Sequence, residues 1–178
     1  MGGIGSNSNR NFISEEIRFA LDKWARNPTN IRKASVGQNF VSLPFYSEFN
    51  QQQDNERAKR IESFVNGSSV KSTIYRGIEN LSEEDYNRFT TIGAIINQNG
   101  LSSWSTNKGI AVGHGKTGRA IVFVQKGAQN SKRLGNITGT GTENEVIMSS
   151  KEQQRVTRIE HSKYTTFVYT ESVRRRKR

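Results

Sequence analysis

Hydrophobic positions in the first half of the chain recur at the spacing of an amphipathic helix. Trp24, Ile61 and Phe64 lie on the apolar faces of two such segments, so we expect these three side chains in the core. Ser82 precedes Asp85 by three residues, which is a capping-box pattern and marks the start of a further helix. The pattern therefore predicts helices over 14–25 and 54–65 and a short one after residue 82.

The sequence pattern changes from Lys71 onward, where short runs of residues with high β-propensity are separated by turns of Gly, Ser and Asn. Helices followed by many short strands, without regular alternation, are typical of an α+β fold with mostly antiparallel pairing. Strands are predicted over 72–75, 100–105, 120–125, 145–148, 154–159 and 164–169.

A chain of 178 residues predicts a single domain. Residues 1–11 are rich in Gly, Ser and Asn and are expected to be disordered. The domain is predicted over 12–172, with a helical lead-in over 12–70 and a β-rich core over 71–172. A basic tail follows over 173–178.

The N-terminus lacks the positive start and apolar stretch of a signal peptide, and no apolar run is long enough for a transmembrane segment. We therefore expect a cytoplasmic protein, in the producing cell or in a target cell. Gly2 and Ser6 match the N-myristoylation pattern, which would attach the chain to a membrane only in a eukaryotic cell. The alternative is an unstructured terminus without a lipid.

The chain is strongly basic, with 27 Lys and Arg against 16 Asp and Glu and a net charge of +11. This balance favours polyanionic partners: nucleic acid, nucleotide phosphates or an acidic protein surface. The absence of cysteine excludes disulfides and thiol catalysis, and two histidines are too few for a multi-histidine site, so we expect no metal.

Two carboxylates end a long stretch without any acidic residue. No Asp or Glu occurs between Asp85 and Glu143, and Glu145 follows where a Gly/Thr-rich turn enters an apolar run. Residues i and i+2 of a strand share one face, and paired carboxylates suit the cleavage of a glycosidic bond. The alternative is a solvated strand edge.

Two further motifs offer polar groups at strand ends. Arg76 is followed by Gly77, an arrangement that can aim a guanidinium fork at a phosphate or carboxylate. Residues 100–106 are rich in hydroxyls, and a buried serine among them could fix the rotamer of a carboxylate. The alternatives are a surface arginine and an ordinary strand edge with Trp104 in the core.

The order and spacing of these motifs resemble the arginine–serine–glutamate class of mono-ADP-ribosyltransferases, of bacterial toxin, effector or phage type. The matching residues lie in 75–77, in 100–105, at Ala111 and in 143–148. The resemblance covers about residues 70–170 and implies two packed antiparallel sheets with N-terminal helices and NAD in a cleft between the sheets.

The sequence departs from the family in three places, one of which is the stretch between Phe123 and Leu134, where the aromatic that the family usually offers to nicotinamide has no counterpart after Phe123. Trp104 stands where the family usually has Thr, so Ser102 and Ser105 compete with Ser103 for the position of the motif serine, which we assign to Ser103. His114 stands where the family often has Phe.

The resemblance implies a role for each motif. Arg76 would clamp the NAD diphosphate, with Gly77, Ser103, Trp104 and Ser105 completing the NAD-binding set. Ser103 would also hold the carboxylate that acts in catalysis.

Both carboxylates have implied roles as well. Glu145 would bind the nicotinamide-ribose hydroxyl and stabilise the oxocarbenium ion as nicotinamide leaves. Glu143 would orient and deprotonate the acceptor, and in the family a Glu at this position accompanies arginine acceptors.

The expected function is therefore transfer of ADP-ribose from NAD to a protein arginine, by a toxin, effector or host-modifying enzyme. The positive charge keeps two alternatives open: an RNA or DNA base as acceptor, and a non-catalytic module that binds nucleic acid. Partners would be NAD, the target macromolecule and an antitoxin or immunity protein. The basic stretch 108–133 holds Phe123 as its one aromatic, which disfavours a stacking platform for bases.

Overall fold

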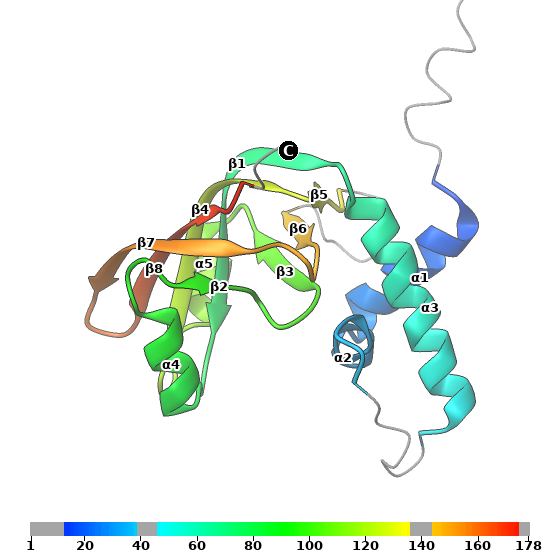
Figure 1. Ribbon diagram of the computed structural model, residues 1–178, viewed down its shortest axis with the longest axis horizontal. Helices are drawn as coiled ribbons and strands as arrows, with labels where there is room; N and C mark the ends of the chain where they lie inside the picture. The colour runs from blue at the N-terminus through cyan, green and yellow to red at the C-terminus, as the bar shows by residue number, and fades with distance from the viewer. Residues whose placement is uncertain (1–12, 39–45, 136–143, 175–178) are drawn as a thin grey trace, which may run out of the picture.

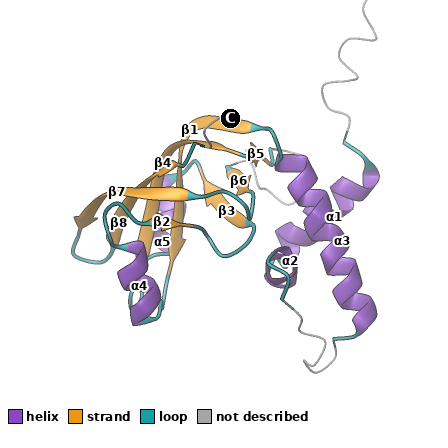
Figure 2. Ribbon diagram, in the orientation of Figure 1, coloured by secondary structure: helices purple, strands orange, loops and turns teal. Residues whose placement is uncertain are grey.

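A layer of helices stands beside a twisted sheet in the computed structural model, which describes residues 13–38, 46–135 and 144–174 (Figures 1 and 2). The expected disordered segment 1–11 with Gly2, and the end of the basic tail, lie outside the described residues. Of the helices in the described ranges, none is long and apolar enough to cross a membrane. The helical layer consists of α1 (Glu15–Arg26), α2 (Thr29–Ser35) and α3 (Glu48–Val65).

Helix α1 follows the predicted amphipathic pattern. The Ser14 side chain caps its first turn by accepting a hydrogen bond from the Ile17 N–H, at 3.3 Å. Ala20, Leu21 and Trp24 are buried along one face, as their spacing predicts. The prediction of a helix over 14–25 is therefore confirmed.

The other two helices of the layer differ from the prediction. The sequence pattern left α2 unassigned, although it begins directly after Pro28, a residue that is favourable at a helix start. Helix α3 begins at Glu48, six residues earlier than the predicted start at 54. The Ser47 side chain caps this start by accepting a hydrogen bond from the Asn50 N–H. The buried positions in its first turns include Gln51 and Asp54, so hydrophobic periodicity could not reveal this part of the helix.

Within the described ranges, eight strands form the sheet, in the spatial order β2-β7-β8-β4-β1-β3-β6-β5. The predicted strands all appear, and β2 and β5 are additional short ones. Two short helices, α4 (Glu83–Phe89) and α5 (Lys108–Gly113), flank the sheet, and the capping serine predicted α4 but not α5. The strands are β1 (Ser69–Ile78), β2 (Ile95–Ile96), β3 (Ser102–Ser105), β4 (Ile121–Gln129), β5 (Ser131–Arg133), β6 (Glu145–Met148), β7 (Gln154–His161) and β8 (Thr166–Ser172).

A narrow junction joins the two halves of this sheet. Strand β1 pairs with β4 along its length, but with β3 only at Tyr75 and Ser105. The two sheets implied by the family resemblance are therefore linked by hydrogen bonds into one. Pairing is antiparallel except between β4 and β8, which run parallel. The α+β class is confirmed, and the junction lies next to Arg76 in the sequence.

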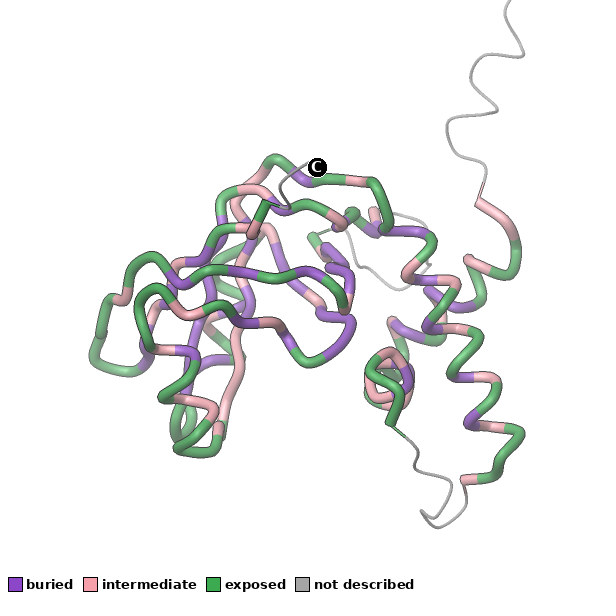
Figure 3. Tube along the Cα trace, in the orientation of Figure 1, coloured by how far each residue is buried: buried purple, intermediate pink, exposed green. Residues whose placement is uncertain are grey.

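Buried positions occur in both the helices and the sheet (Figure 3). Among the described residues they form one hydrophobic cluster between helices α1–α3 and the sheet and another within the sheet. The predicted core residues Trp24, Ile61 and Phe64 are buried in the helical cluster, which also contains Ile147 of β6. Val146, the residue before it, belongs to the sheet cluster instead. Alternate side chains of β6 thus face the helices and the sheet, which places the start of this strand between the two layers.

Helix α5 packs against β1 at a glycine, which generates a test of this contact. A Cβ atom on Gly77 would lie 2.0 Å from the Ala111 carbonyl oxygen and 2.9 Å from the His114 carbonyl carbon. We expect Gly77→Ala to lower the free energy of unfolding by about 1–3 kcal/mol, because backbone atoms cannot move aside without separating α5 from β1. Urea denaturation measures the change.

The matched control is Gly113→Ala at the end of α5, where an added Cβ meets no atom within 4 Å. This control should be neutral or stabilising by about 0.5 kcal/mol. Equal stability of the two variants would contradict the close packing of α5 on β1.

Candidate active site

A cleft of about 460 Å³ opens where β1, β3, β6 and α5 meet. Its walls bring together residues from all the sequence motifs that the structure describes: Arg76 and Gly77 of β1, Ser103 and Ser105 of β3, and Glu145 of β6. The antiparallel pairing of β3 with β6 sets Ser105 opposite Glu145. Motifs far apart in the sequence therefore form one site.

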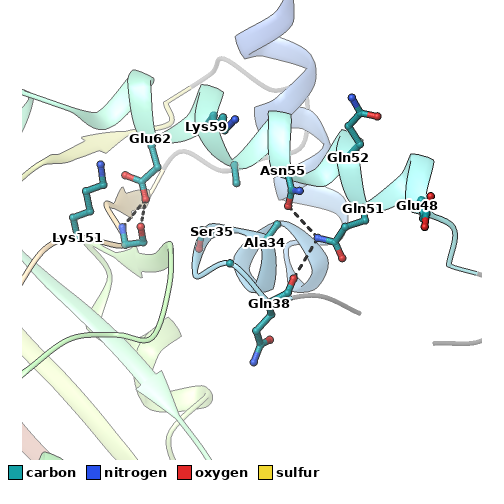
Figure 4. Close-up of a pocket in the computed structure, with 13 residues that line it drawn as sticks. Ala34, Ser35, Gln38, Glu48, Gln51, Gln52, Asn55, Lys59, Glu62 and Lys151 are labelled. Atoms are coloured by element: carbon teal, nitrogen blue, oxygen red, sulfur yellow. Dashed lines mark hydrogen bonds between the residues drawn. The ribbon is translucent and has the colours of Figure 1, made fainter. Parts of the chain in front are cut away.

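A larger cavity, of about 760 Å³, lies between α2, α3 and the turn after β6, but it offers less chemistry (Figure 4). One of its two carboxylates, Glu62, accepts hydrogen bonds from Ser149 and from the Ser150 backbone and side chain. The Gln51 amide donates to the Gln38 carbonyl oxygen and to Asn55. These polar groups already bind one another, so we place the candidate active site in the smaller cleft.

Glu145 receives two hydrogen bonds on the same carboxylate oxygen. The Ser103 hydroxyl donates to Oε1 at 2.5 Å, and the Trp24 indole Nε1 donates to Oε1 at 3.3 Å. In the described part of the chain no donor contacts Oε2. The carboxylate is therefore held at one oxygen while the other remains available to a ligand.

The three serines that compete for the motif position have different hydrogen-bond partners. The Ser102 hydroxyl accepts from the Trp104 indole at 2.8 Å, and the Ser105 hydroxyl accepts from the Asn107 N–H at 3.0 Å. Within the described residues, Ser103 is the one of the three whose hydroxyl donates to the Glu145 carboxylate. The geometry is compatible with Ser103 as the motif serine, an assignment that stays a prediction.

The environment of Glu145 disfavours its charge. Burial raises the pKa of the Glu145 carboxyl, and the hydrogen bonds from Ser103 and Trp24 offset part of this effect because they stabilise the carboxylate. A carboxyl with a raised pKa in a cleft is typical of functional sites.

Arg76 is a buried cation that pairs with no anion among the described residues. Its side chain is 9% exposed, and Nη1 donates to the Ser103 carbonyl oxygen at 3.1 Å. Its Nε is buried without a hydrogen-bond partner, and no ion pair involves Arg76 across the three described ranges. A buried charge needs an opposite charge or hydrogen bonds to offset its desolvation, so the site fits an anionic ligand.

A second guanidinium strengthens this positive environment. Burial lowers the pKa of Arg76, and the nearby charge of Arg32 lowers it further. Arg32 belongs to α2, where its Nη2 donates to the Gln98 carbonyl oxygen at 2.9 Å. No sequence pattern pointed to Arg32, because its helix was not predicted and the partner of its guanidinium, Gln98, is 66 residues away in the chain.

Trp104 and Gly77 shape the walls of the cleft. The Trp104 side chain is 1% exposed and its ring lies 6.1 Å from that of Phe123, so it is mainly a core residue that backs the site. Gly77 lets the Ala111 backbone approach β1 closely, and exposed His114 also lines the cleft.

The first carboxylate of the pair, Glu143, lies outside the described residues. Its neighbour Asn144 lines the cleft and is held by a hydrogen bond from the Thr106 N–H to its carbonyl oxygen, at 2.9 Å. Within the described chain no three His, Asp or Glu side chains gather in a way that could hold a metal ion.

No protein-family model and no curated protein sequence matches the chain. Solved structures do match. One is the Vis toxin, an ADP-ribosyltransferase of Vibrio splendidus, in its complex with agmatine: TM-score 0.71, 17% identity, 92% of this chain and 77% of that one covered. Another is exoenzyme S of Pseudomonas aeruginosa, with human 14-3-3 protein beta and carba-NAD: TM-score 0.67, 14% identity, 94% and 82% covered.

A third similar structure is the type III effector XopAI of Xanthomonas axonopodis pv. citri, with a TM-score of 0.65, 14% identity and 95% and 71% of the two chains covered. At these identities the likeness concerns the fold. The chain has the fold of ADP-ribosyltransferases, as the sequence motifs implied.

The raised pKa of Glu145 predicts that this residue reduces stability. The folded state disfavours the ionised carboxylate, so the contribution of Glu145 to stability is most favourable below its pKa in the unfolded chain and is lost as the pH rises through its higher pKa in the folded protein. We expect Glu145→Gln, which keeps an acceptor for Ser103 and Trp24, to raise the free energy of unfolding at neutral pH by about 1 kcal/mol.

The gain should vanish at acidic pH, where the wild-type carboxyl is neutral as well, and urea denaturation at both pH values measures it. Exposed Glu56, changed to Gln, is the matched control and should alter stability by less than about 0.5 kcal/mol at either pH. Destabilisation by Glu145→Gln at neutral pH would contradict the desolvation of this carboxylate.

Proposed function

We propose that the protein is an NAD-dependent mono-ADP-ribosyltransferase of the arginine–serine–glutamate class, which transfers ADP-ribose to arginine on a target protein and acts as a toxin or effector. The observation that carries the proposal is the Ser103–Glu145 hydrogen bond in one cleft with Arg76, in a chain with this fold.

The cleft suits the binding of NAD. Its volume of about 460 Å³ lies within the usual range for small-molecule sites, roughly 300–1,000 Å³. The diphosphate of NAD supplies the anion that Arg76 lacks, and the buried Nε of Arg76 is a donor for one of its oxygens. Arg32 adds a second positive charge on the side of the helical layer.

The state of Glu145 suits the cleavage of the N-glycosidic bond. Its Oε2 is placed to accept a hydrogen bond from a hydroxyl of the nicotinamide ribose. The bond from C1′ to nicotinamide breaks, nicotinamide leaves with the electron pair, and the ribose becomes an oxocarbenium ion. The negative charge of Glu145, in a partly dry cleft, stabilises that cation.

The acceptor then attacks C1′. A guanidinium nitrogen of arginine forms the new bond to C1′ and gives its proton to Glu143, two residues before Glu145 in the chain. The complex of the Vis toxin with agmatine supports a guanidinium acceptor, since agmatine carries the same group as arginine. The net charge of +11 favours an acidic target surface.

The same charge supports a second candidate, in which the acceptor is a base of RNA or DNA. Binding to nucleic acid strengthens with each phosphate that a basic side chain neutralises. A non-catalytic binding module is less well supported, because the Glu145 carboxylate would repel phosphates and would not help such a surface to bind nucleic acid. We place the action in the cytoplasm, of the producing cell or of a target cell.

The test of the proposed chemistry is nicotinamide release from NAD. Glu145→Gln should lower the rate by about 10²–10³-fold, since it removes a preorganised charge from the transition state. Glu56→Gln, the exposed control, should keep the wild-type rate. Absence of release by wild-type protein, with and without a cell lysate as a source of acceptors, would overturn the proposed activity.

The acceptor is identified with labelled NAD and a cell lysate, followed by separate treatment with protease and nuclease. We expect label that protease removes and that mass spectrometry places on arginine. Glu143→Gln should lower this labelling more than about 10²-fold, because the variant lacks the proposed general base. Nicotinamide release should persist, because the variant keeps Glu145. Label removed by nuclease alone would overturn the arginine acceptor in favour of a nucleic-acid base.

A further inference from the structure

We propose that Trp24 of the helical layer is a positioning residue for Glu145, so that α1 takes part in the catalytic apparatus. The inference deepens the proposed function and rests on it. The contact joins residues 121 positions apart in the sequence, and it crosses from the helices to the start of β6.

Because the Trp24 side chain is buried, its indole N–H must donate its hydrogen bond to a protein group rather than to water. The side chain is 2% exposed and is packed in the helical cluster with Leu21 and Ile61. A buried indole N–H normally has a hydrogen-bond partner, because an unpaired one loses its bond to water without replacement. Here the partner is Oε1 of Glu145, at 3.3 Å.

Two donors from different layers fix the orientation of the carboxylate. Ser103 reaches Oε1 from β3 and Trp24 reaches the same oxygen from α1. A single hydrogen bond would leave the carboxylate free to swing about that contact, whereas two donors from separate elements restrict it. Oε2 is therefore directed to one place, which is what a group that must meet a ribose hydroxyl requires.

The indole also affects the charge of Glu145. A hydrogen bond to the carboxylate favours its ionised form and opposes the effect of burial on the pKa. The other charged or titratable groups that line the cleft are Tyr75 and Arg76 of β1 and His114 after α5, in the part of the chain that the structure describes. Loss of the Trp24 N–H should therefore raise the pKa of Glu145.

Trp24→Phe removes the N–H and keeps an aromatic ring in the helical core. We expect kcat for nicotinamide release at neutral pH to fall about tenfold, the effect of losing one hydrogen bond to a charged group. The KM for NAD should change little, because Arg76 is untouched. The acidic limb of the pH–rate profile should move to higher pH, a change that simple loss of packing would not produce.

The matched control is Tyr86→Phe in α4, which removes the hydrogen bond between the Tyr86 hydroxyl and Thr166, 2.8 Å long, away from the cleft. It should leave kcat and the pH profile unchanged. Wild-type kcat and an unmoved acidic limb in Trp24→Phe would overturn the role of Trp24. Absence of nicotinamide release by the wild type would instead overturn the proposed function.

A second measurement needs neither catalysis nor a variant at Trp24. The chain has two tryptophans, and the other one, Trp104, donates to Ser102 at 2.8 Å and not to a carboxylate. In NMR spectra the Trp24 indole N–H signal should shift with pH as Glu145 titrates, while the Trp104 signal stays constant. Glu145→Gln should abolish the shift. A Trp24 signal that does not titrate in the wild type would overturn the contact and the proposal.

Discussion

The site depends on keeping a buried cation and a partly buried anion in one cleft without letting them pair. Ser103 separates them: its carbonyl oxygen accepts from Arg76, and its hydroxyl donates to Glu145. A direct ion pair would satisfy both charges and leave neither for a ligand. The cleft instead leaves the Nε of Arg76 and the Oε2 of Glu145 without partners among the described residues.

Such an arrangement lowers stability at the site, and the surrounding structure compensates for it. Burial disfavours the charge of both Arg76 and Glu145, as the directions of their pKa shifts indicate. The helical and sheet clusters supply the opposing hydrophobic free energy, and β6 contributes to both. A site that is unfavourable by itself is thus held between two well-packed layers, which is a common compromise between stability and activity.

The sequence predicted those parts of the fold and the site that depend on local pattern. Helix α1, most strands and the motif residues Arg76, Ser103 and Glu145 follow from periodicity and motif order. The first turns of α3 escaped prediction because their buried residues include polar ones. The hydrogen bond from the Trp24 indole to Glu145 was not predicted, because a tryptophan on the apolar face of a helix shows the same sequence pattern whatever its N–H contacts.

The distance in sequence between Trp24 and Glu145 also bears on folding kinetics. Contacts across 121 residues require the closure of a long loop, which is slow and becomes favourable only after other elements have formed. During synthesis, α1 leaves the ribosome long before β6, so the Trp24 indole has no Glu145 to donate to until β6 has been made. The hydrogen bonds to Glu145 can form only once β6 has been synthesised, and a nascent chain that ends before β6 contains Arg76 but lacks Glu145.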